Sequence, residues 1–302
     1  MKIPLGMSLP HRSPDPIDMT AVRDVAQRAD ALGFRDLWVT ENAVDHVFSF
    51  DPAVILTYAA AVTSKIRLGV SVSVLPVRNP IHVAHQVATL DYVSGGRAIL
   101  GAGLGREHHY AEFQIPTERR VRRFKEGIEL IKALWTEPKV TYQGDFYRLE
   151  GGTMVIKPVQ KPYPPIWLGG DHPDAVSRAA TVADGWMGSG GSSKATFARC
   201  VPILREALEK AGRDPATFPI SKRVFMSVHA RPEVAREELN RWFTVVYRNP
   251  AGTDASGVHG TLEQVRERLE ELVASGANHL LLNPICRYAE QVEALAAFVG
   301  RT

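Results

Sequence analysis

Three glycines in five positions follow a short apolar run in the segment RAILGAGLGREHHY, residues 97–110. Glycine-rich turns of this kind often hold nucleotide phosphates, because they present backbone N–H groups to an anion. The spacing here is G-x-G-x-G, whereas dinucleotide-binding folds use G-x-G-x-x-G and an acidic residue at the end of a following strand. The segment therefore indicates a turn that another group approaches closely, and not a Rossmann-type loop.

A second glycine pair is the better candidate for binding a phosphate. In GGDHPDAV (169–176), two glycines are followed at once by a helix that should open near Pro173. A helix N-terminus concentrates unpaired N–H groups and a partial positive charge, which together favour an anion. We expect the phosphate end of any cofactor to lie here.

The sequence predicts no metal site and no disulfide. His108 and His109 are adjacent, but no third ligand is evident for them. Cys200 and Cys286 are the two cysteines of the chain, and they lie in unrelated patterns. A reducing compartment is the expected setting for such a chain.

Composition and charge narrow the class of protein. The chain has 302 residues, of which 45% are hydrophobic and 23% charged, as in ordinary soluble globular proteins. The net charge is only +3 and basic residues form no extended block, so nucleic acid is not an expected partner. Neither an apolar signal core nor a membrane-length apolar run is present. We expect a cytoplasmic protein with no membrane contact.

Short apolar segments alternate with helical patterns along the whole chain. Eight segments have the length and composition of strands: 3–9, 36–40, 66–76, 97–103, 164–170, 184–191, 218–230 and 278–284. Eight strands, each followed by a helix, predict a (β/α)8 TIM barrel of α/β class, and an open doubly wound sheet is the alternative. We expect one domain over 1–302, with a β-hairpin near 139–156 and a mobile loop near 247–258.

Barrel enzymes carry their active sites at the carboxyl ends of the strands. Polar residues and glycines gather at these ends, namely in Leu9–His11, Thr40–Asn42, Ser71–Leu75, Gly101–His109, Gly169–Asp171, Met187–Gly191, Val228–Ala230 and Asn283–Pro284. Paired carboxylates or a nucleophile elbow, which would indicate a hydrolase, are not evident there.

Six ordered blocks resemble one known family over essentially the whole length. They are LWVTEN (37–42), NPIHVAHQVATLDYVSGGRAILGAGLG (79–105), RRFKEGIELIKALW (122–135), KPVQKPYPPIWLGG (157–170), AATVADGW (179–186) and HGTLEQVRERLEELVASGANHLLLNP (259–284). The chain resembles the bacterial luciferase-like family of flavin- and deazaflavin-dependent oxidoreductases.

The resemblance implies a barrel that forms a homodimer and binds coenzyme F420, or alternatively FMN, across the strand ends. It also implies a non-proline cis peptide bulge at Ser71–Val72, with Ser73 as the neighbouring alternative, that supports the middle ring. The implied cofactor contacts are Asn42, Ser71, Val72, Ser73, Gly103, His109, Gly169 and Gly170.

Two departures from the family pattern affect the chemistry. Deazaflavin dehydrogenases of this family often have an acid–His pair where this chain has Glu41 and Asn42, and asparagine cannot act as a base near neutral pH. They also often have Glu where Arg106 stands. Both changes weaken an assignment as a sugar-phosphate dehydrogenase, and Arg106 suits an anionic substrate or the phosphate tail of the cofactor.

We therefore predict an oxidoreductase that transfers a hydride between coenzyme F420 and a small organic substrate. The predicted catalytic residues are His109, Glu41 and Arg106, with His11 and Tyr110 as further candidate proton donors. The alternatives are an FMN-dependent monooxygenase fed by a partner reductase, and an F420-binding protein without catalysis. The substrate depends on loops 106–118, 187–194 and 244–258, and the sequence does not reveal it.

Overall fold

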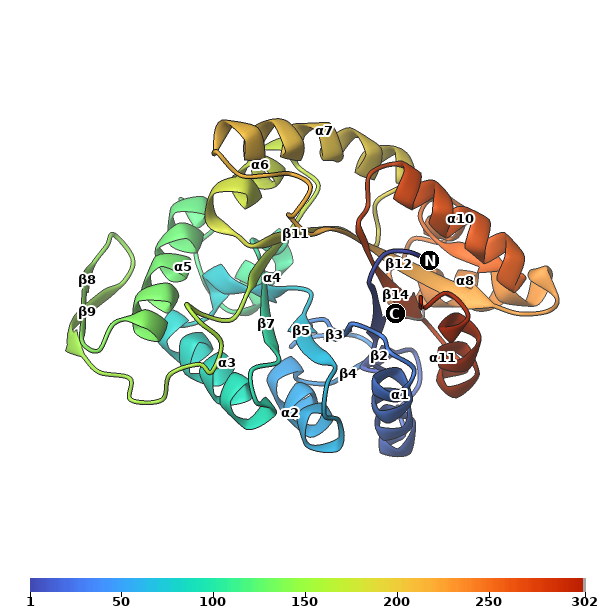
Figure 1. Cartoon of the computed structure of the whole chain (residues 1–302), viewed down its shortest axis with the longest axis horizontal. Coiled ribbons are helices and arrows are strands. Elements are labelled where there is room, and N and C mark those ends of the chain that lie inside the picture. Colours follow the sequence, from blue (N-terminus) through green and yellow to red (C-terminus); the bar gives the residue numbers. More distant parts are fainter. Residues whose placement is uncertain (301–302) are drawn as a thin grey trace.

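Eight parallel strands close into a barrel in the computed structural model, which describes residues 1–300 (Figure 1). In barrel order they are β1 (Leu5–Ser8), β3 (Asp36–Val39), β5 (Arg67–Val70), β7 (Ala98–Gly103), β10 (Ile166–Gly169), β11 (Gly185–Gly188), β12 (Ile220–Val228) and β14 (His279–Pro284). β7 pairs with both β5 and β10, and β14 pairs with β1, so the sheet has no open edge. The predicted (β/α)8 barrel is confirmed, and the open sheet is wrong.

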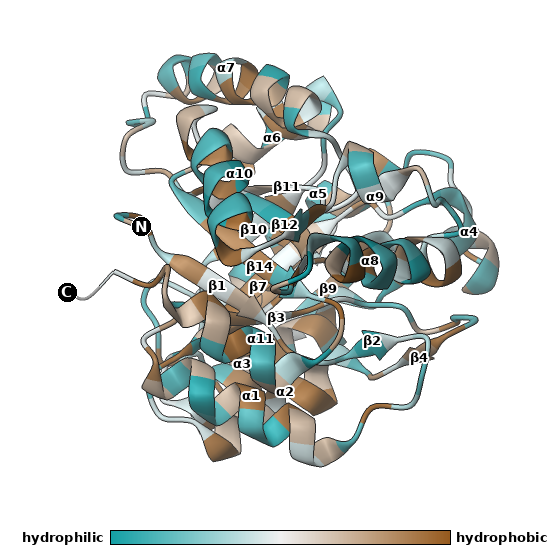
Figure 2. Cartoon of the chain, turned by 90° about the vertical axis from the view of Figure 1, so that its right-hand side faces the viewer, coloured by the Kyte–Doolittle hydropathy of each residue, from teal (hydrophilic) through white to brown (hydrophobic). Residues whose placement is uncertain are grey.

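Helices surround the barrel, and most of them pack an apolar face inward (Figure 2), although α2 and α3 also expose Val54, Tyr92 and Val93. Asp51 and Asn79 cap the helices that follow them, and each is followed by proline at the first helical position. The helices are α1 (Met19–Ala31), α2 (Pro52–Val62), α3 (Pro80–Ser94), α4 (Glu107–Glu112), α5 (Arg120–Thr136), α6 (Pro173–Val182), α7 (Lys194–Lys210), α8 (Pro232–Val246), α9 (Gly252–Ala255), α10 (Leu262–Ala274) and α11 (Tyr288–Ala296), with a 3-10 turn at Leu75–Val77.

The connections carry several smaller elements. The predicted hairpin is confirmed as β8 (Val140–Gln143) and β9 (Arg148–Gly152), which project beside α5 at the left of Figure 1. The structure adds a small sheet of β2 (Arg12–Ser13) and β4 (Phe48–Ser49), and the short strands β6 (Ser73–Val74) and β13 (Val258–Gly260).

Part of the segment predicted as a mobile loop at 247–258 is packed structure. It contains α9, and Thr253 within that helix is buried. A Cβ on Gly252 would lie 2.5 Å from a ring carbon of Phe243, so the backbone sits directly against α8. Residues 248–251 of the segment lie on the surface as expected, so it is the α9 part that differs from the prediction.

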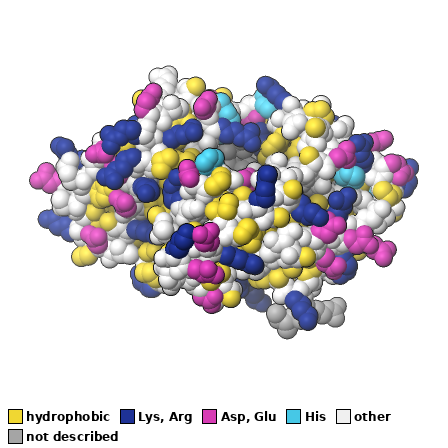
Figure 3. Space-filling model, turned by 90° about the horizontal axis from the view of Figure 1, so that it is seen from above, with side chains coloured by type: hydrophobic (Ala, Val, Ile, Leu, Met, Phe, Trp, Pro, Cys, Tyr) yellow, Lys and Arg dark blue, Asp and Glu magenta, His cyan; other side chains and the backbone are white. Residues whose placement is uncertain are grey.

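Acidic and basic side chains are interspersed over the face shown in Figure 3. Among residues 1–300, no helix combines the length and the apolar character that a bilayer crossing requires.

A buried polar network joins the amino ends of four barrel strands. The Asp36 carboxylate accepts hydrogen bonds from Trp38 Nε1, from Arg67 Nη2 at 2.8 Å and from His279 Nε2 at 3.1 Å. The other ring nitrogen of His279 lies 2.7 Å from Ser221 Oγ. Burial alone would raise the pKa of Asp36, but His279 and Arg67 hold that pKa well below its usual range. The network therefore ties β3, β5, β12 and β14 together through one ionised group.

Replacing Asp36 with asparagine should destabilise the fold by about 3 kcal/mol, because it leaves Arg67 and His279 without their anion. A carboxyl group with a lowered folded-state pKa contributes stability above its unfolded pKa, about 3.9, and loses that contribution as the pH falls further. Urea unfolding followed by circular dichroism should thus show a smaller drop in unfolding free energy on acidification for Asp36→Asn than for the natural chain. The exposed control Glu209→Gln should match the natural chain, and an equally stable Asp36→Asn would contradict the role of the network.

Candidate active site

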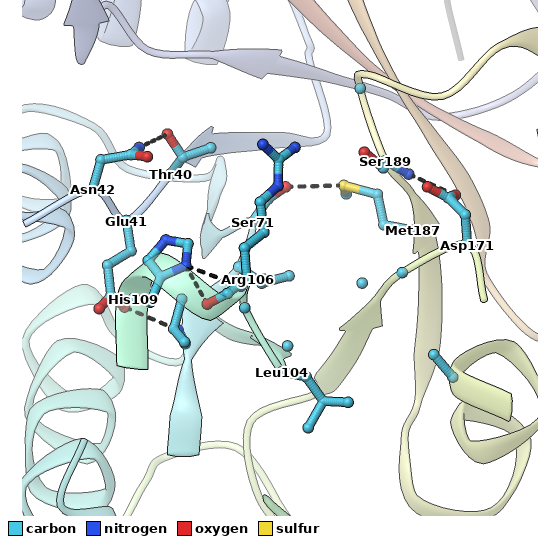
Figure 4. A pocket seen from close by; sticks show the side chains of 18 of the residues that line it. Thr40, Glu41, Asn42, Ser71, Leu104, Arg106, His109, Asp171, Met187 and Ser189 are labelled. Carbon is cyan, nitrogen blue, oxygen red and sulfur yellow. Dashed lines mark hydrogen bonds between the residues drawn. The ribbon is translucent and has the colours of Figure 1, made fainter. Parts of the chain in front are cut away.

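A cavity of about 1070 Å³ opens at the carboxyl ends of the barrel strands (Figure 4). Segments that follow β3, β5, β7, β10 and β11 line it. The predicted site residues that line it are Glu41, Asn42, Ser71, Val72, Gly103, Arg106, His109, Gly169 and Gly170. Ser73, the alternative position for the bulge, is buried in β6 and does not line the cavity.

The middle of the cavity floor is formed where the third barrel strand is interrupted between β5 and β6. The Ser71–Val72 peptide bond is cis, at the position that was predicted for the bulge. The Ser71 N–H still donates to the Val39 carbonyl at 2.7 Å, and Ser71 Oγ lies 3.2 Å from the Met187 sulfur across the barrel mouth. Strands on both sides of the cavity therefore hold Ser71 in place.

The glycines of the GAGLG segment make room for this bulge. A Cβ on Gly101 would lie 1.8 Å from the Val70 carbonyl oxygen, and one on Gly103 would lie 2.5 Å from a methyl group of Val72. On the far side, a Cβ on Gly169 would lie 2.7 Å from the other Val72 methyl group. Contacts below 3 Å do not occur in packed proteins, so glycine is required at all three positions by the neighbouring strand.

Glu41 is anchored by two partners at one wall of the cavity. Its Oε1 accepts from Arg78 Nε at 2.8 Å, and its Oε2 accepts from the Val74 N–H at 3.2 Å. The Glu41 side chain is buried, and Figure 4 shows it beside His109. With both oxygens engaged, Glu41 holds the start of the 3-10 turn after β6 in position.

The short helix α4 orients His109, which the sequence predicted to lie in a loop. His109 is the third residue of α4, and its Nδ1 accepts the Arg106 N–H at 3.0 Å. Because Nδ1 is the acceptor, the proton of the neutral ring is on Nε2. Burial and the neighbouring His108 lower the pKa of His109, which keeps the ring neutral near pH 7. His109 can therefore offer one N–H group to a ligand in the cavity.

Two other candidate proton donors, His11 and Tyr110, are buried behind the cavity wall and do not line it. His11 Nδ1 donates to the Leu9 carbonyl at 2.6 Å, and Nε2 accepts from Thr40 Oγ1 at 2.8 Å. Burial lowers the pKa of His11 to about 3. The Tyr110 hydroxyl donates to the Leu104 carbonyl at 2.6 Å. Both side chains are fully engaged within the protein, so their predicted role as donors to a ligand is wrong.

The opposite end of the cavity has the features of an anion site. Gly170 has φ +140°, and the N-terminus of α6 follows two residues later with His172 as its cap. Arg178 of α6 also lines the cavity and forms no ion pair within residues 1–300. Asp171 accepts the Ser189 N–H at 3.1 Å, which joins this loop to the one after β11.

Comparison of the sequence with known families gives a match over most of the barrel. Residues 3–251 match the family described as luciferase-like monooxygenase. The chain belongs to this family.

Two relatives of this luciferase-like protein are oxidoreductases by name, one F420-dependent and one that reduces a pterin. The F420-dependent glucose-6-phosphate dehydrogenase of Kineococcus radiotolerans is 30% identical over 252 residues, which are 80% of this chain and 73% of the relative. The 5,10-methylenetetrahydromethanopterin reductase of Methanolobus tindarius is 31% identical over 203 residues, 67% of this chain and 60% of the relative.

Solved structures confirm the fold of this luciferase-like protein. The monooxygenase RslO1 from Streptomyces bottropensis superposes with a TM-score of 0.85 at 22% identity, over 98% of each chain. An F420-dependent secondary alcohol dehydrogenase, bound to an F420–acetone adduct, superposes with a TM-score of 0.86 at 20% identity, over 99% of this chain and 98% of the other. An oxygenase and a deazaflavin dehydrogenase thus share this barrel, so the fold alone does not identify the reaction.

Sequence reasoning missed Arg223, which lines the cavity from the middle of β12. The expected site residues of this strand were Val228–Ala230, at its carboxyl end. β12 is longer than the other barrel strands, and its second half pairs with β13 beyond the barrel. The signal was present, since two consecutive cations, Lys222 and Arg223, interrupt an otherwise strand-like segment.

Replacing Gly103 with alanine should lower the unfolding free energy of this luciferase-like protein by about 1–3 kcal/mol, because the new methyl group overlaps Val72. Chemical denaturation measures the change. The matched control is Gly127→Ala inside α5, where the nearest atom to a Cβ lies 3.7 Å away, and helix propensity predicts a gain of about 1 kcal/mol. Equal stability of Gly103→Ala and the natural chain would show that the bulge does not need the glycine.

Proposed function

We propose that this protein is an oxidoreductase that uses coenzyme F420 to transfer a hydride to or from a small organic molecule. The observation that supports it most directly is the 30% identity to an F420-dependent dehydrogenase over 80% of the chain. The proposal also draws on the cavity, since a cofactor-sized space at the carboxyl ends of the strands is where barrel enzymes bind their ligands.

The residues of the cavity fit such a coenzyme. We place its ring system against Ser71 and Val72, where the interrupted strand forms the floor between Met187 and the glycines of β7. We place its phosphate near Gly170 and the N-terminus of α6, with Arg178 as the nearby cation. In this placement the flat ring lies on the backbone of the interrupted strand, and the anionic tail lies beside a helix N-terminus and a cation.

Bound F420 supplies a carbon that carries or accepts the hydride. The protein must then position the substrate and satisfy the charge that changes on its oxygen. His109 is suited to this task, because its Nε2–H belongs to a neutral ring that Arg106 holds in one tautomer. We assign His109 as the group that donates a hydrogen bond to the reacting oxygen, and Glu41 as a positioning residue beside it. The proton that the oxygen gains on reduction, or loses on oxidation, is exchanged with water, because the only N–H of neutral His109 stays on its ring.

Titration of the purified protein with F420 and, separately, with FMN tests the cofactor. We expect quenching of F420 fluorescence at micromolar concentrations and binding of FMN that is at least about 10-fold weaker, because the chain is 30% identical to an F420-dependent dehydrogenase over 80% of its length. Tighter binding of FMN, with oxygen consumption in the presence of a flavin reductase, would contradict the proposal and favour a monooxygenase. Binding of F420 without turnover across a panel of alcohols, aldehydes, ketones and their acids would favour a non-catalytic role.

Replacing His109 with glutamine should lower kcat about 100-fold, because the N–H donor at the reacting oxygen is lost from its position. Glutamine is itself a good residue at the third position of a helix, where it can retain the bond to the Arg106 N–H. Steady-state kinetics with F420 and circular dichroism would separate the two effects. An unchanged kcat would remove His109 from the mechanism.

A further inference from the structure

Arg223 is a buried guanidinium that faces the cavity. It is 8% exposed, and its planar group lies 4.6 Å from the centre of the Phe225 ring. Both Nε and Nη2 donate to the same atom, Asn283 Oδ1, at 2.9 and 2.5 Å. Nη1 has only a long contact of 3.5 Å with the Ser71 carbonyl. Each Nη nitrogen carries two hydrogens, so a second N–H on Nη1 and a second N–H on Nη2 have no protein acceptor within residues 1–300.

Arg97, a second buried arginine outside the cavity, provides a comparison for the hydrogen bonding of Arg223. It is equally buried, and each of its five N–H groups has an acceptor: Ser94 O, Thr63 Oγ1, Ile66 O, Ala60 O and Thr63 O. Its hydrogen bonding is complete, whereas that of Arg223 is not. An incompletely bonded buried cation is costly, and such groups are concentrated at functional sites.

The charge of Arg223 is also uncompensated. Within residues 1–300, no carboxylate lies within 4.0 Å of it. The nearby Arg12 forms an ion pair with Asp45 at 2.6 Å. Of these two arginines, therefore, Arg12 has an acidic partner and Arg223 has none within residues 1–300. Burial, followed by the repulsion from Arg12, lowers the pKa of Arg223 to about 10, which keeps it charged near pH 7. A single positive charge thus faces the cavity without an internal partner.

We propose that Arg223 binds a carboxylate group of the substrate. The two free N–H groups on Nη1 and Nη2 form the planar fork that matches the two oxygens of a carboxylate. Arg223 contacts Ser71, on which we place the coenzyme ring, so a carboxylate bound here holds the rest of the molecule beside the transfer site. This inference rests on the proposed function, and it narrows the substrate to small organic acids or their carbonyl derivatives.

The coenzyme is a second possible source of negative charge, because a reduced ring system can itself be anionic. The two sources differ in what the loss of Arg223 would change. If the partner is the substrate, binding of F420 in either redox state is retained and binding of carboxylates is lost. If the partner is the ring, binding of reduced F420 weakens and binding of carboxylates is retained.

Benzoate and its neutral isostere benzamide are suitable probes, titrated by calorimetry into the F420-loaded protein. The natural chain should bind benzoate at least about 10-fold more tightly than benzamide. Arg223→Met should remove this preference, and so should Asn283→Asp, which supplies an internal carboxylate to the same guanidinium at nearly constant volume. The control Arg231→Met, at an exposed position outside the cavity after the same strand, should retain the preference.

Equal binding of benzoate and benzamide by the natural chain would overturn the proposal, as would retention of the preference in Asn283→Asp. Weaker binding of reduced F420 by Asn283→Asp, with the benzoate preference intact, would assign Arg223 to the coenzyme instead. If Arg223→Met does not fold, Asn283→Asp and Arg223→Lys decide between these outcomes. Failure of the natural chain to bind F420 would contradict the proposed function separately, since the benzoate titration of the coenzyme-free protein still reports on Arg223.

Discussion

The insertion of the Ser71–Val72 segment into the mouth of the barrel is the constraint on which the rest of the site depends. The two methyl groups of Val72 occupy the space where Gly103 and Gly169 would carry side chains. Strands on either side of the bulge must therefore carry glycine, so the cavity wall beside Val72 is backbone. The position of Ser71 in turn sets the distances to Met187 and Arg223, which lie on the far wall.

The barrel treats buried charge differently at its two ends. At the amino ends of the strands, Asp36 is surrounded by Arg67, Trp38 and His279, so that charge and hydrogen bonds are balanced inside the protein. At the cavity, Arg223 has an amide oxygen as its main partner and no acid among residues 1–300. A network in which every polar group has a partner stabilises the packing of the strands. A buried cation with unpaired N–H groups can instead form its remaining hydrogen bonds with a ligand.

Local backbone structure determines what the titratable groups of the cavity can do. His109 is a hydrogen-bond donor because the helix N-terminus at Arg106 uses its Nδ1 atom. Glu41 is a buried acid on that wall, but Arg78 and the Val74 N–H engage its two oxygens. Helix capping thus leaves His109 one N–H group to offer, and ion pairing engages both oxygens of Glu41. From residue type alone, both side chains were candidate catalytic acids or bases.

The sequence by itself determined the barrel and much of its mouth. Apolar runs and capped helices are local signals, so the eight strands, the Asp51 and Asn79 caps and the hairpin near residue 144 could be read directly. The family pattern further located the cis peptide bond at Ser71–Val72. Only the tertiary structure showed that the bulge requires Gly101 and Gly103, and that His11 is buried away from the cavity. It also showed that Arg223 hydrogen-bonds to Asn283, which lies 60 residues further along the chain. These facts depend on distances between side chains of separate strands, and no local pattern in the chain encodes such distances.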